Sequence, residues 1–348
     1  MYLTCLPISR SIRENPAEVP RENVILFDEA QRAWDSTQVA RFTKKSLRNS
    51  EPELFLEIMG RVPNWSVIIA VVGSGQEINR GEAGLGEWGD AILKSETKWI
   101  VRASPRVLPG NPDIPSQPLF GHVDSLLDFT QDTRLHLEMN VKSPRAEALN
   151  QWVDALIDLR LSDARNLFET IDEFPLVLTR ELDNAKQWLR DRTDEDHRCG
   201  LVANASAKRL RAWGIDTNSL RKDSAWADWF LKPRGDVRSS NQLEIAATNF
   251  DCQGLELDWV GMCWGNDLVF DDIQSNWDTR LFRGTSWVRA SEDPRKFMLN
   301  SYRFLLTRAR RGMVIWVPKA DGCDTTLNPA HFDATADLLR EAGLSLID

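Results

Sequence analysis

The chain has 348 residues, of which 42% are hydrophobic and 27% are charged, and its formal net charge at pH 7 is −9. This composition is typical of a globular protein with room for two domains of ordinary size. The sequence contains no run of 18 apolar residues, which argues against a membrane span. The acidic balance argues against a nucleic-acid coat protein, although it is compatible with a local basic groove.

The cysteines and the N-terminus indicate the compartment. Five cysteines are scattered without a Cys-x-x-Cys pair, and the first residues lack the apolar core of a signal peptide. The four histidines are far apart and show no metal-ligand spacing. We therefore expect a cytoplasmic protein with reduced thiols, without a structural metal site and without a membrane partner.

Two continuous apolar runs near the N-terminus predict buried strands. They are residues 24–27 and 66–72, and residues 44–60 between them carry apolar side chains at helical spacing. A glycine-rich stretch then leads into a helix-like segment, and residues 98–102 predict a shorter strand. Five prolines follow between residues 105 and 118, and this stretch is the best candidate for a linker.

Strands and helices alternate again after the linker. The expected strands are residues 134–140, 174–178, 199–203, 243–248, 259–264 and 313–317, and the expected helices are residues 145–161, 182–191, 207–213 and 298–310. Alternation on both sides of a linker predicts the α/β class, with one parallel-sheet domain in residues 1–120 and another in residues 121–348.

Four short segments carry the functional signal. They are FDEAQR (residues 27–32), VVGSGQEINRGEAG (71–84), ATNFDCQGLELDWVG (247–261) and YRFLLTRARRG (302–312). Each alone has an ordinary explanation, such as the end of a strand, a glycine turn or a solvated basic helix face. Found together, in this order and beside predicted strands, they are far more specific than any one of them.

The set resembles motifs II, III, V and VI of superfamily 1 helicases. More narrowly, GQEINRGEAG, QGLELDWVG and YRFLLTRARRG are similar to the bacterial helicase-like ATPase domain related to the C-terminal helicase part of Schlafen proteins. The resemblance covers residues 24–318. It implies an α/β fold of two RecA-like (P-loop NTPase type) parallel-sheet domains, the first incomplete at its N-terminus, with ATP and Mg²⁺ as cofactors and single-stranded DNA or RNA as partner.

The resemblance also assigns roles to individual residues. Asp28 would bind Mg²⁺, Glu29 would polarise the attacking water beside that metal, and Gln76 would sense the γ-phosphate. Arg308 corresponds to the arginine finger, and Glu256 to the motif V residue at the nucleotide edge of the second domain. The remaining residues expected around the nucleotide are Gln31, Arg32, Gly73, Gly75, Glu77, Lys142, Arg145, Gly254 and Arg311.

One position departs from the family pattern. Lys142 stands where motif IV commonly has an arginine, and lysine keeps the charge but loses the bidentate fork, so that Arg145 is the alternative for this contact. Basic clusters at Lys208, Arg209, Arg211, Lys232, Arg234 and Arg238, with Trp213, Trp226 and Trp229 near them, fit either a phosphate-tracking groove or ordinary solvated faces.

The sequence contains no phosphate-binding loop of the form Gly-x-x-x-x-Gly-Lys-Ser/Thr, because none of its 19 glycines precedes a lysine. We expect a chain that begins inside its first RecA-like domain and that alone is a weak or inactive ATPase. Three interpretations stay open: a fragment of a longer helicase or translocase motor, half of a split motor whose loop lies on another chain or segment, and a non-catalytic nucleic-acid or protein-binding module. A nuclease built on Asp28 and Glu29 is a weaker alternative, since no second carboxylate cluster is present.

An incomplete first sheet has a further consequence. Apolar strand edges near residues 24–27 and 66–72 are expected to be exposed. The sequence therefore predicts either poor solubility or a partner that covers them.

Overall fold

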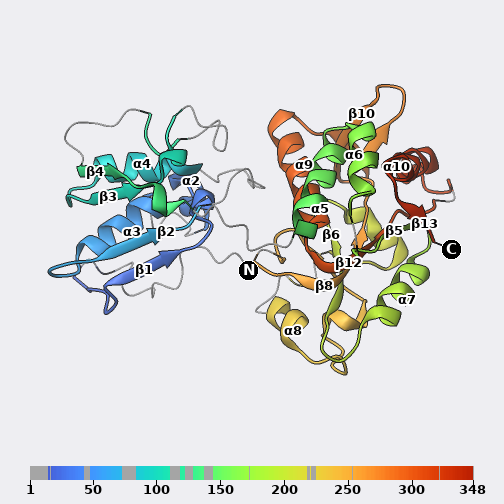
Figure 1. The fold of residues 1–348 in the computed structure, drawn as a ribbon, viewed down its shortest axis with the longest axis horizontal. Helices are drawn as coiled ribbons and strands as arrows, with labels where there is room; N and C mark the ends of the chain where they lie inside the picture. Colours follow the sequence, from blue (N-terminus) through green and yellow to red (C-terminus); the bar gives the residue numbers. More distant parts are fainter. Residues whose placement is uncertain are drawn as a thin grey trace. The chain divides into compact units, whose positions relative to one another are not determined.

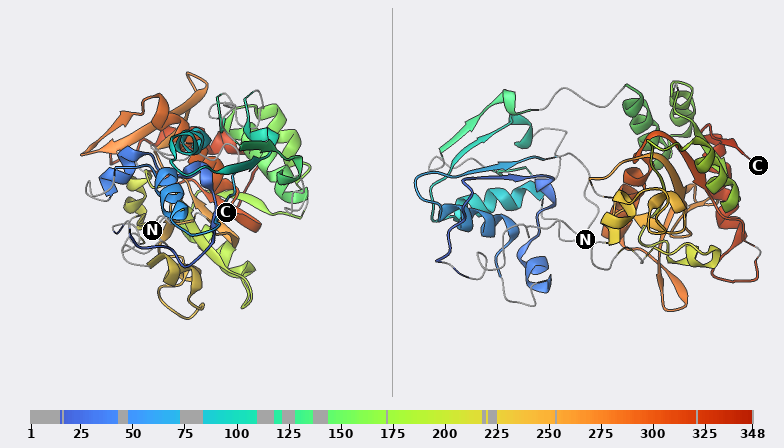
Figure 2. Two further views of the ribbon diagram at one scale, coloured as in Figure 1. Left: turned by 90° about the vertical axis from the view of Figure 1, so that its left-hand side faces the viewer. Right: turned by 90° about the horizontal axis from the view of Figure 1, so that it is seen from below.

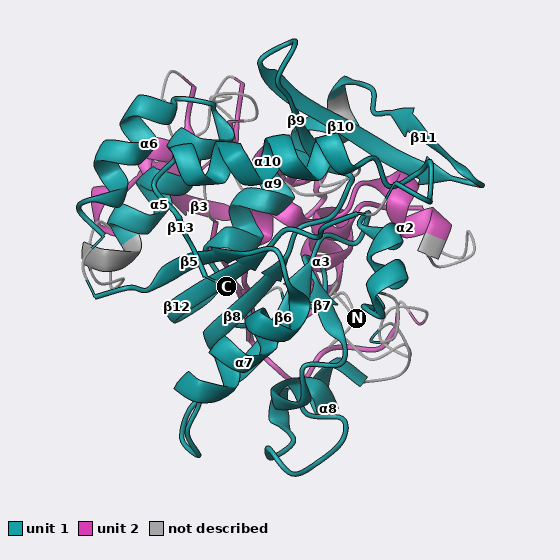
Figure 3. Cartoon of the chain, turned by 90° about the vertical axis from the view of Figure 1, so that its right-hand side faces the viewer, with its two compact units in different colours: residues 1–2, 141–348 teal, residues 3–140 magenta. Residues whose placement is uncertain are grey.

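The computed structural model describes residues 15, 17–42, 48–72, 84–109, 118–121, 128–136, 144–171, 173–217, 220, 225–252, 254–320 and 322–347. The chain divides into two compact units, which are coloured separately in Figure 3: unit 1, residues 1–2 and 141–348, and unit 2, residues 3–140. The division falls after residue 140 rather than after residue 120. The reason is that β4 (Asp128–Gln131), which the sequence did not predict, pairs in parallel with β3 (Ile100–Ala103) in unit 2.

Unit 1 is built on a six-stranded sheet in the order β13-β5-β12-β8-β6-β7, and every neighbouring pair in it runs parallel. The strands are β5 (Leu176–Thr179), β6 (Cys199–Ala203), β7 (Ala246–Thr248), β8 (Leu257–Cys263), β12 (Ala309–Trp316) and β13 (Ser345–Leu346). The continuous apolar runs that predicted buried strands at residues 174–178, 199–203, 259–264 and 313–317 are thus confirmed as elements of this sheet.

Helices cover both faces of this sheet. The helices of unit 1 are α5 (Pro144–Ile157), α6 (Leu161–Phe168), α7 (Leu182–Arg192), α8 (Ala225–Leu231), α9 (Glu292–Leu306) and α10 (Pro329–Glu341), and the short 3-10 turns are η4 (Lys208–Trp213) and η6 (Ser240–Gln242). Figure 3 shows α5, α9 and α10 on one side of the sheet and α7 on the other. Side chains of β12 alternate accordingly, with Met313 and Ile315 packed in the first core and Val314 and Trp316 in the second.

A second, antiparallel sheet is inserted between β8 and α9. Its order is β11-β10-β9, with β9 (Leu268–Asp271), β10 (Asn276–Arg283) and β11 (Ser286–Arg289). The sequence did not predict it. Its tryptophans are fixed by distant partners, since Trp277 Nε1 donates to the carbonyl oxygen of Ile157 and Trp287 Nε1 donates to that of Thr326.

Unit 2 contains two separate pairs of parallel strands. One pair is β1 (Val24–Phe27) with β2 (Val67–Ala70), and the other is β3 with β4; the helices are α2 (Ser36–Phe42), α3 (Glu51–Gly60) and α4 (Gly84–Lys94), with η1 (Ala30–Arg32), η2 (Pro105–Val107) and η3 (Thr133–Leu135) as short turns. Figures 1 and 2 show these elements. The core is aromatic: the Phe27 ring meets the rings of Phe55 and Trp88 edge-on, with centroids 5.0 and 5.3 Å apart.

Two predicted elements are partly wrong. Residues 134–135, expected in a strand, lie in η3, because Asp132 Oδ1 accepts the Arg134 N–H at 3.0 Å and closes a turn. The helix expected to reach residue 310 ends at Leu306, where Thr307 Oγ1 donates to the carbonyl oxygen of Phe304, and β12 begins at Ala309. Among the helices that the structure describes, none combines the length and apolar character of a membrane span.

Candidate functional site

The acid pair Asp28–Glu29 lies at the carboxyl end of β1. The carbonyl oxygen of Phe27 accepts the Val71 N–H at 2.9 Å, and the Ala30 N–H donates to the carbonyl oxygen of Val71 at 2.8 Å. These two backbone hydrogen bonds lie on either side of the acid pair in the sequence and therefore hold it beside the end of β2. The GSGQE segment follows directly in the sequence, and its Gly73, Gly75, Gln76 and Glu77 lie outside the described residues.

The backbone bends sharply at the second acid. Glu29 has φ 54° and ψ 44°, in the left-handed region that few residues other than glycine adopt. The bend is held by local contacts: Gln31 Nε2 donates to Glu29 Oε2 at 2.6 Å, and Arg32 Nε lies 3.6 Å from the same oxygen. The predicted residues Gln31 and Arg32 thus orient Glu29, while the carboxylate of Asp28 is exposed and accepts the Glu29 N–H at 3.0 Å.

The donor set of the acid pair fits magnesium of the kind bound with phosphates. Mg²⁺ in nucleotide sites takes one or two carboxylates and fills its other positions with waters and phosphate oxygens. Asp28 offers one exposed carboxylate at a strand end, and Glu29 offers a second that is already hydrogen-bonded. Within the described residues no cluster of three or more His, Cys, Asp or Glu side chains is arranged for a metal, so a metal held entirely by protein is not indicated there.

In unit 1 the predicted motif V and motif VI segments meet where β8 and β12 begin. Leu257 pairs with Ala309, and the Leu257 N–H donates to the carbonyl oxygen of Arg308 at 3.1 Å. Gly254, with φ +72°, turns the chain just before this point, and the pairing register of β12 shifts between Ala309 and Gly312. At this amino end of the sheet Leu257 and Ala309 are buried, whereas Arg310 and Arg311, at the register shift, are exposed.

Three arginines are gathered at this end, in different environments. Arg308 is 9% exposed: its guanidinium carbon lies 4.2 Å from the Phe304 ring centroid, and its Nε donates to the Phe304 carbonyl oxygen at 3.2 Å. Arg310 and Arg311 are more exposed. Arg310 Nε forms an ion pair with Glu256 Oε2 at 3.0 Å, so the structure brings the predicted Glu256 into the same cluster.

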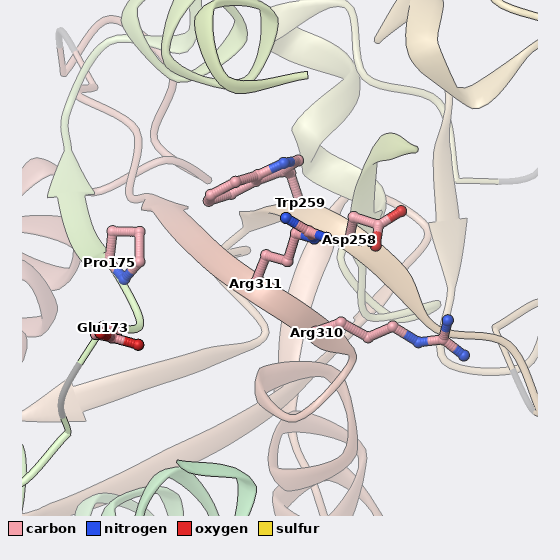
Figure 4. Close-up of a pocket in the computed structure, with 6 residues that line it drawn as sticks. All are labelled: Glu173, Pro175, Asp258, Trp259, Arg310 and Arg311. Carbon is pink, nitrogen blue, oxygen red and sulfur yellow. Dashed lines mark ion pairs between the residues drawn. The ribbon is translucent and has the colours of Figure 1, made fainter. Parts of the chain in front are cut away.

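A pocket of about 540 Å³ opens beside this cluster, at the amino ends of β5, β8 and β12 (Figure 4). It is lined by Glu173, Pro175, Asp258, Trp259, Arg310 and Arg311. Arg311 Nε lies 3.7 Å from Asp258 Oδ1, and Figure 4 shows the Arg311 guanidinium next to the Trp259 ring. The pocket thus combines an aromatic surface, two guanidinium groups and two carboxylates.

Of the residues that line the pocket, sequence reasoning named only Arg311. Arg310 carried a signal that was missed, since it lies in the same TRARRG run. Asp258 and Trp259 lie inside the QGLELDWVG segment but were not named individually, and Glu173 carried no signal, because only the parallel pairing of β12 with both β5 and β8 brings these residues together. Lys142 lies outside the described residues; Arg145 belongs to the first turn of α5, and its side chain also lies outside them.

The predicted basic clusters are largely neutralised. Arg211 pairs with Asp216 at 2.9 Å and Arg238 with Asp236 at 2.8 Å, while Arg209 forms an ion pair with Asp324. The Arg238 guanidinium beside Asp236 holds the pKa of that carboxyl well below its usual range. These pairs favour solvated faces over a continuous groove along η4 and the segment that follows α8.

The family model described as "Schlafen group 3, DNA/RNA helicase domain" matches residues 6–319. No curated protein matches the chain.

Proposed function

Because the chain belongs to the Schlafen group 3 DNA/RNA helicase domain family, we propose that it is part of an ATP-dependent motor that unwinds or translocates along single-stranded DNA or RNA. In this proposal both units are RecA-like. Unit 2 supplies the acid pair that handles magnesium and water, and unit 1 supplies the arginine cluster that neutralises phosphate charge.

The observation that carries the proposal is the geometry of Asp28 and Glu29. They follow a parallel strand at its carboxyl end, where α/β sheets bind ligands, and the end of β2 is hydrogen-bonded beside them. Bound MgATP supplies the phosphoryl group that is transferred to water. Asp28 holds the metal, and Glu29, aimed by Gln31, orients the water.

The arginine cluster provides the complementary half of the proposal. Arg308 acts as the arginine finger, a role that stabilises charge in the transition state of other nucleotide hydrolases. Its buried contact with Phe304 fixes the guanidinium at the end of α9, and the exposed Arg310 and Arg311, which follow it in the sequence, pair with Glu256 and Asp258. Glu256 and Gly254 form the edge of the nucleotide site in unit 1.

The proposal requires a phosphate-binding loop that this sequence does not contain. A partner chain, or a segment that is not in this sequence, must supply the backbone N–H groups and the lysine that hold the β- and γ-phosphates. Without such a segment, the domain acts as a non-catalytic module that binds nucleic acid or protein.

The test measures ATP turnover by the protein isolated from its native cells with its bound partners, with and without single-stranded DNA or RNA. We expect turnover stimulated by the nucleic acid, lost in Asp28→Asn and kept in the control Asp90→Asn, whose carboxylate is exposed on α4. Binding of single strands that ignores MgATP, with no turnover in any preparation, would instead establish the non-catalytic module.

A further inference from the structure

The hairpin of β10 and β11 reaches beyond the rest of its sheet. β9 pairs with β10 only from Asn276 to Thr279, so residues 280–289 form a two-stranded ribbon. Figure 3 shows β10 and β11 at the margin of unit 1, away from the strands of the six-stranded sheet. Gly284, with φ +60°, makes the tight turn at the tip of the ribbon. None of the four helicase-like segments contains this ribbon, so the proposed function leaves it without a role.

The ribbon is basic in an acidic chain. Its sequence, RLFRGTSWVR, has three arginines and no carboxylate, whereas the whole chain carries a net charge of −9. Arg283, beside the turn, is exposed, and no carboxylate of the described residues forms an ion pair with it. The Nε atoms of Arg280 and Arg289 share one carboxylate, that of Asp278, at 3.4 and 3.7 Å. The ribbon therefore keeps a surplus of positive charge, unlike the paired arginines of η4 and of the segment after α8.

One face of the ribbon combines arginines with aromatic rings. Arg280 lies opposite Arg289 in the strand register, and the next position on that face pairs Phe282 with Trp287. Directly opposed residues and residues two apart lie on the same face of a hairpin, so all four side chains share it. The opposite face carries Leu281, which packs against the core of unit 1. Both aromatic rings are half-buried, and neither belongs to a core cluster of the described residues.

The two rings are fixed by their neighbours. The ring centroids of Phe282 and Trp287 lie 5.1 Å apart, and Trp287 Nε1 donates to the carbonyl oxygen of Thr326 at 2.7 Å. The guanidinium carbon of Arg209 lies 5.3 Å from the Phe282 centroid, and that of Arg280 lies 5.4 Å from the Trp287 ring. Side chains that are already ordered lose little conformational entropy when a ligand packs against them.

The ribbon lies beside the carboxyl edge of the six-stranded sheet. The elements that contact its aromatic face all leave that edge, since η4 follows β6, the ribbon follows β8, and the segment with Thr326 follows β12. The cluster of Arg308, Arg310 and Arg311 lies at the amino edge instead. A ligand on the ribbon and a nucleotide at the arginine cluster would therefore occupy opposite edges of one sheet.

Exposed guanidinium groups beside aromatic rings match the chemistry of single-stranded nucleic acid. Arginines neutralise the phosphates, and aromatic rings stack on bases that are not already stacked in a duplex. An acidic peptide would satisfy the charges but leave the rings unused. Duplex DNA admits a β-ribbon into its major groove, but its bases are stacked on one another and cannot stack on the rings.

We propose that the β10–β11 ribbon binds single-stranded DNA or RNA, with phosphates at Arg283 and Arg289 and a base stacked on Trp287. The proposal rests on the proposed function, which makes such a strand the partner, and adds the surface of unit 1 that holds it. Binding at the ribbon does not require ATP, because the ribbon and the arginine cluster lie at opposite edges of the sheet.

The first test measures the binding of fluorescein-labelled oligo(dT) and oligo(U) by the full chain at several salt concentrations. Arg283→Ala combined with Arg289→Ala should weaken binding at least about tenfold and lower the slope of log K against log salt by about 1.4, since each single-strand phosphate contact contributes about 0.7. The control combines Arg165→Ala on α6 with Arg340→Ala on α10, both exposed. It removes the same charge and should leave affinity and slope unchanged.

The second test locates the strand directly. An oligonucleotide with 5-iodouracil forms photo-cross-links with aromatic side chains that stack on it. Trypsin cuts after Arg283 and Arg289, so a cross-link to Trp287 should appear in the peptide of residues 284–289. Trp287→Leu should lose this product and weaken binding about tenfold without changing the salt slope, because it removes a stacking surface and no charge. All variants should keep the circular dichroism of the parent chain.

Several results would overturn the proposal. They are no binding by the parent chain, unchanged affinity when both arginines are replaced, cross-links only outside residues 280–289, and binding of poly-glutamate or duplex DNA as tight as that of either single strand. ATP turnover is a separate measurement. Binding through the ribbon without turnover would support this proposal and contradict the motor, whereas nucleic-acid-stimulated turnover that depends on Asp28 but not on the ribbon would do the reverse.

Discussion

The N–H of Leu257 donates to the carbonyl oxygen of Arg308 at 3.1 Å, and this single bond ties the start of β8 to the end of the turn that follows α9. Through it the QGLELD and LLTRAR segments keep a fixed spacing, although they lie far apart in the sequence. The Arg308 side chain, in contrast, is held by the ring and the carbonyl oxygen of Phe304. Changes at this residue can thus alter its chemistry without loosening the junction of the strands, because the bond to Leu257 uses only the backbone.

Arg308→Lys tests the finger role on that basis. Lysine keeps the positive charge and the backbone bond but loses the planar fork and the stacking on Phe304. Arginine fingers are worth about 10³–10⁵ in turnover, so we expect nucleic-acid-stimulated ATP turnover to fall at least about a hundredfold. The unfolding free energy should fall by about 2 kcal/mol at most, as expected for one buried cation–π contact that lysine only partly replaces. The control is Arg340→Lys on α10; turnover of Arg308→Lys within twofold of the parent would remove Arg308 from the catalytic role.

Two glycines of α4 should respond oppositely to alanine. Alanine in a helix interior is favoured over glycine by about 1 kcal/mol. At Gly86 a new Cβ meets nothing closer than the Pro118 carbonyl oxygen at 3.7 Å, so Gly86→Ala should be neutral or stabilising. At Gly89 the new Cβ would lie 1.7 Å from the Leu119 carbonyl oxygen, and Gly89→Ala should destabilise unit 2 by about 2 kcal/mol or more. Urea unfolding of both variants gives the comparison, and a shift of the same sign in both would contradict it.

Asp267 should make unit 1 sensitive to pH. It is fully buried immediately before β9, and burial raises its pKa from 3.8 to about 7, although the hydroxyl of Tyr302 donates to Oδ1 at 2.9 Å and opposes the rise. A raised folded-state pKa means that stability is complete below the unfolded value and is lost as pH rises through about 7. The loss is at most roughly 4 kcal/mol.

The measurement is the urea midpoint of Asp267→Asn relative to the parent at pH 5 and pH 8. Asparagine keeps an acceptor for Tyr302 and does not ionise, so the variant should gain relative stability at the higher pH. Asp337→Asn, at an exposed carboxylate of α10, should give the same difference at both pH values. An equally flat response of Asp267→Asn would show that Asp267 is already ionised in the folded protein near neutral pH at no cost.

Features of the fold could be predicted from the sequence where the residues that determine them are neighbours in the sequence, and not where those residues are far apart. The strand at residues 199–203 was predicted with its observed bounds, because an all-apolar run is the local signature of a strand buried on both faces. The acid pair was found for the same reason, since it follows such a run directly. The sheet β9–β10–β11 was missed because Trp277 and Trp287 are fixed by Ile157 and Thr326, partners that leave no mark on the local pattern.

The residues of the candidate site likewise fall into those that could be named from the sequence and those that could not. Glu256, Arg308 and Arg311 belong to short motifs and were named from the sequence alone. Asp258 and Trp259 also lie in a quoted motif segment, but they and Glu173 were not assigned to a pocket, because the strand register of β5, β8 and β12 that brings them together is a property of the folded sheet. The engagement of Arg308 by Phe304 likewise depends on where α9 ends, and the sequence placed that end four residues too late.

The place of β5 in the sheet has a consequence for biosynthesis. Its two neighbours are β12 and β13, which both come from the far end of unit 1. At a translation rate of about 5–20 residues per second, the nascent β5 waits roughly ten seconds for β12 to leave the ribosome. During that interval an apolar strand with two open edges is present in the cell. We therefore expect the yield of folded unit 1 to depend on chaperones that shield the growing chain. This yield should fall when translation slows between β5 and β12.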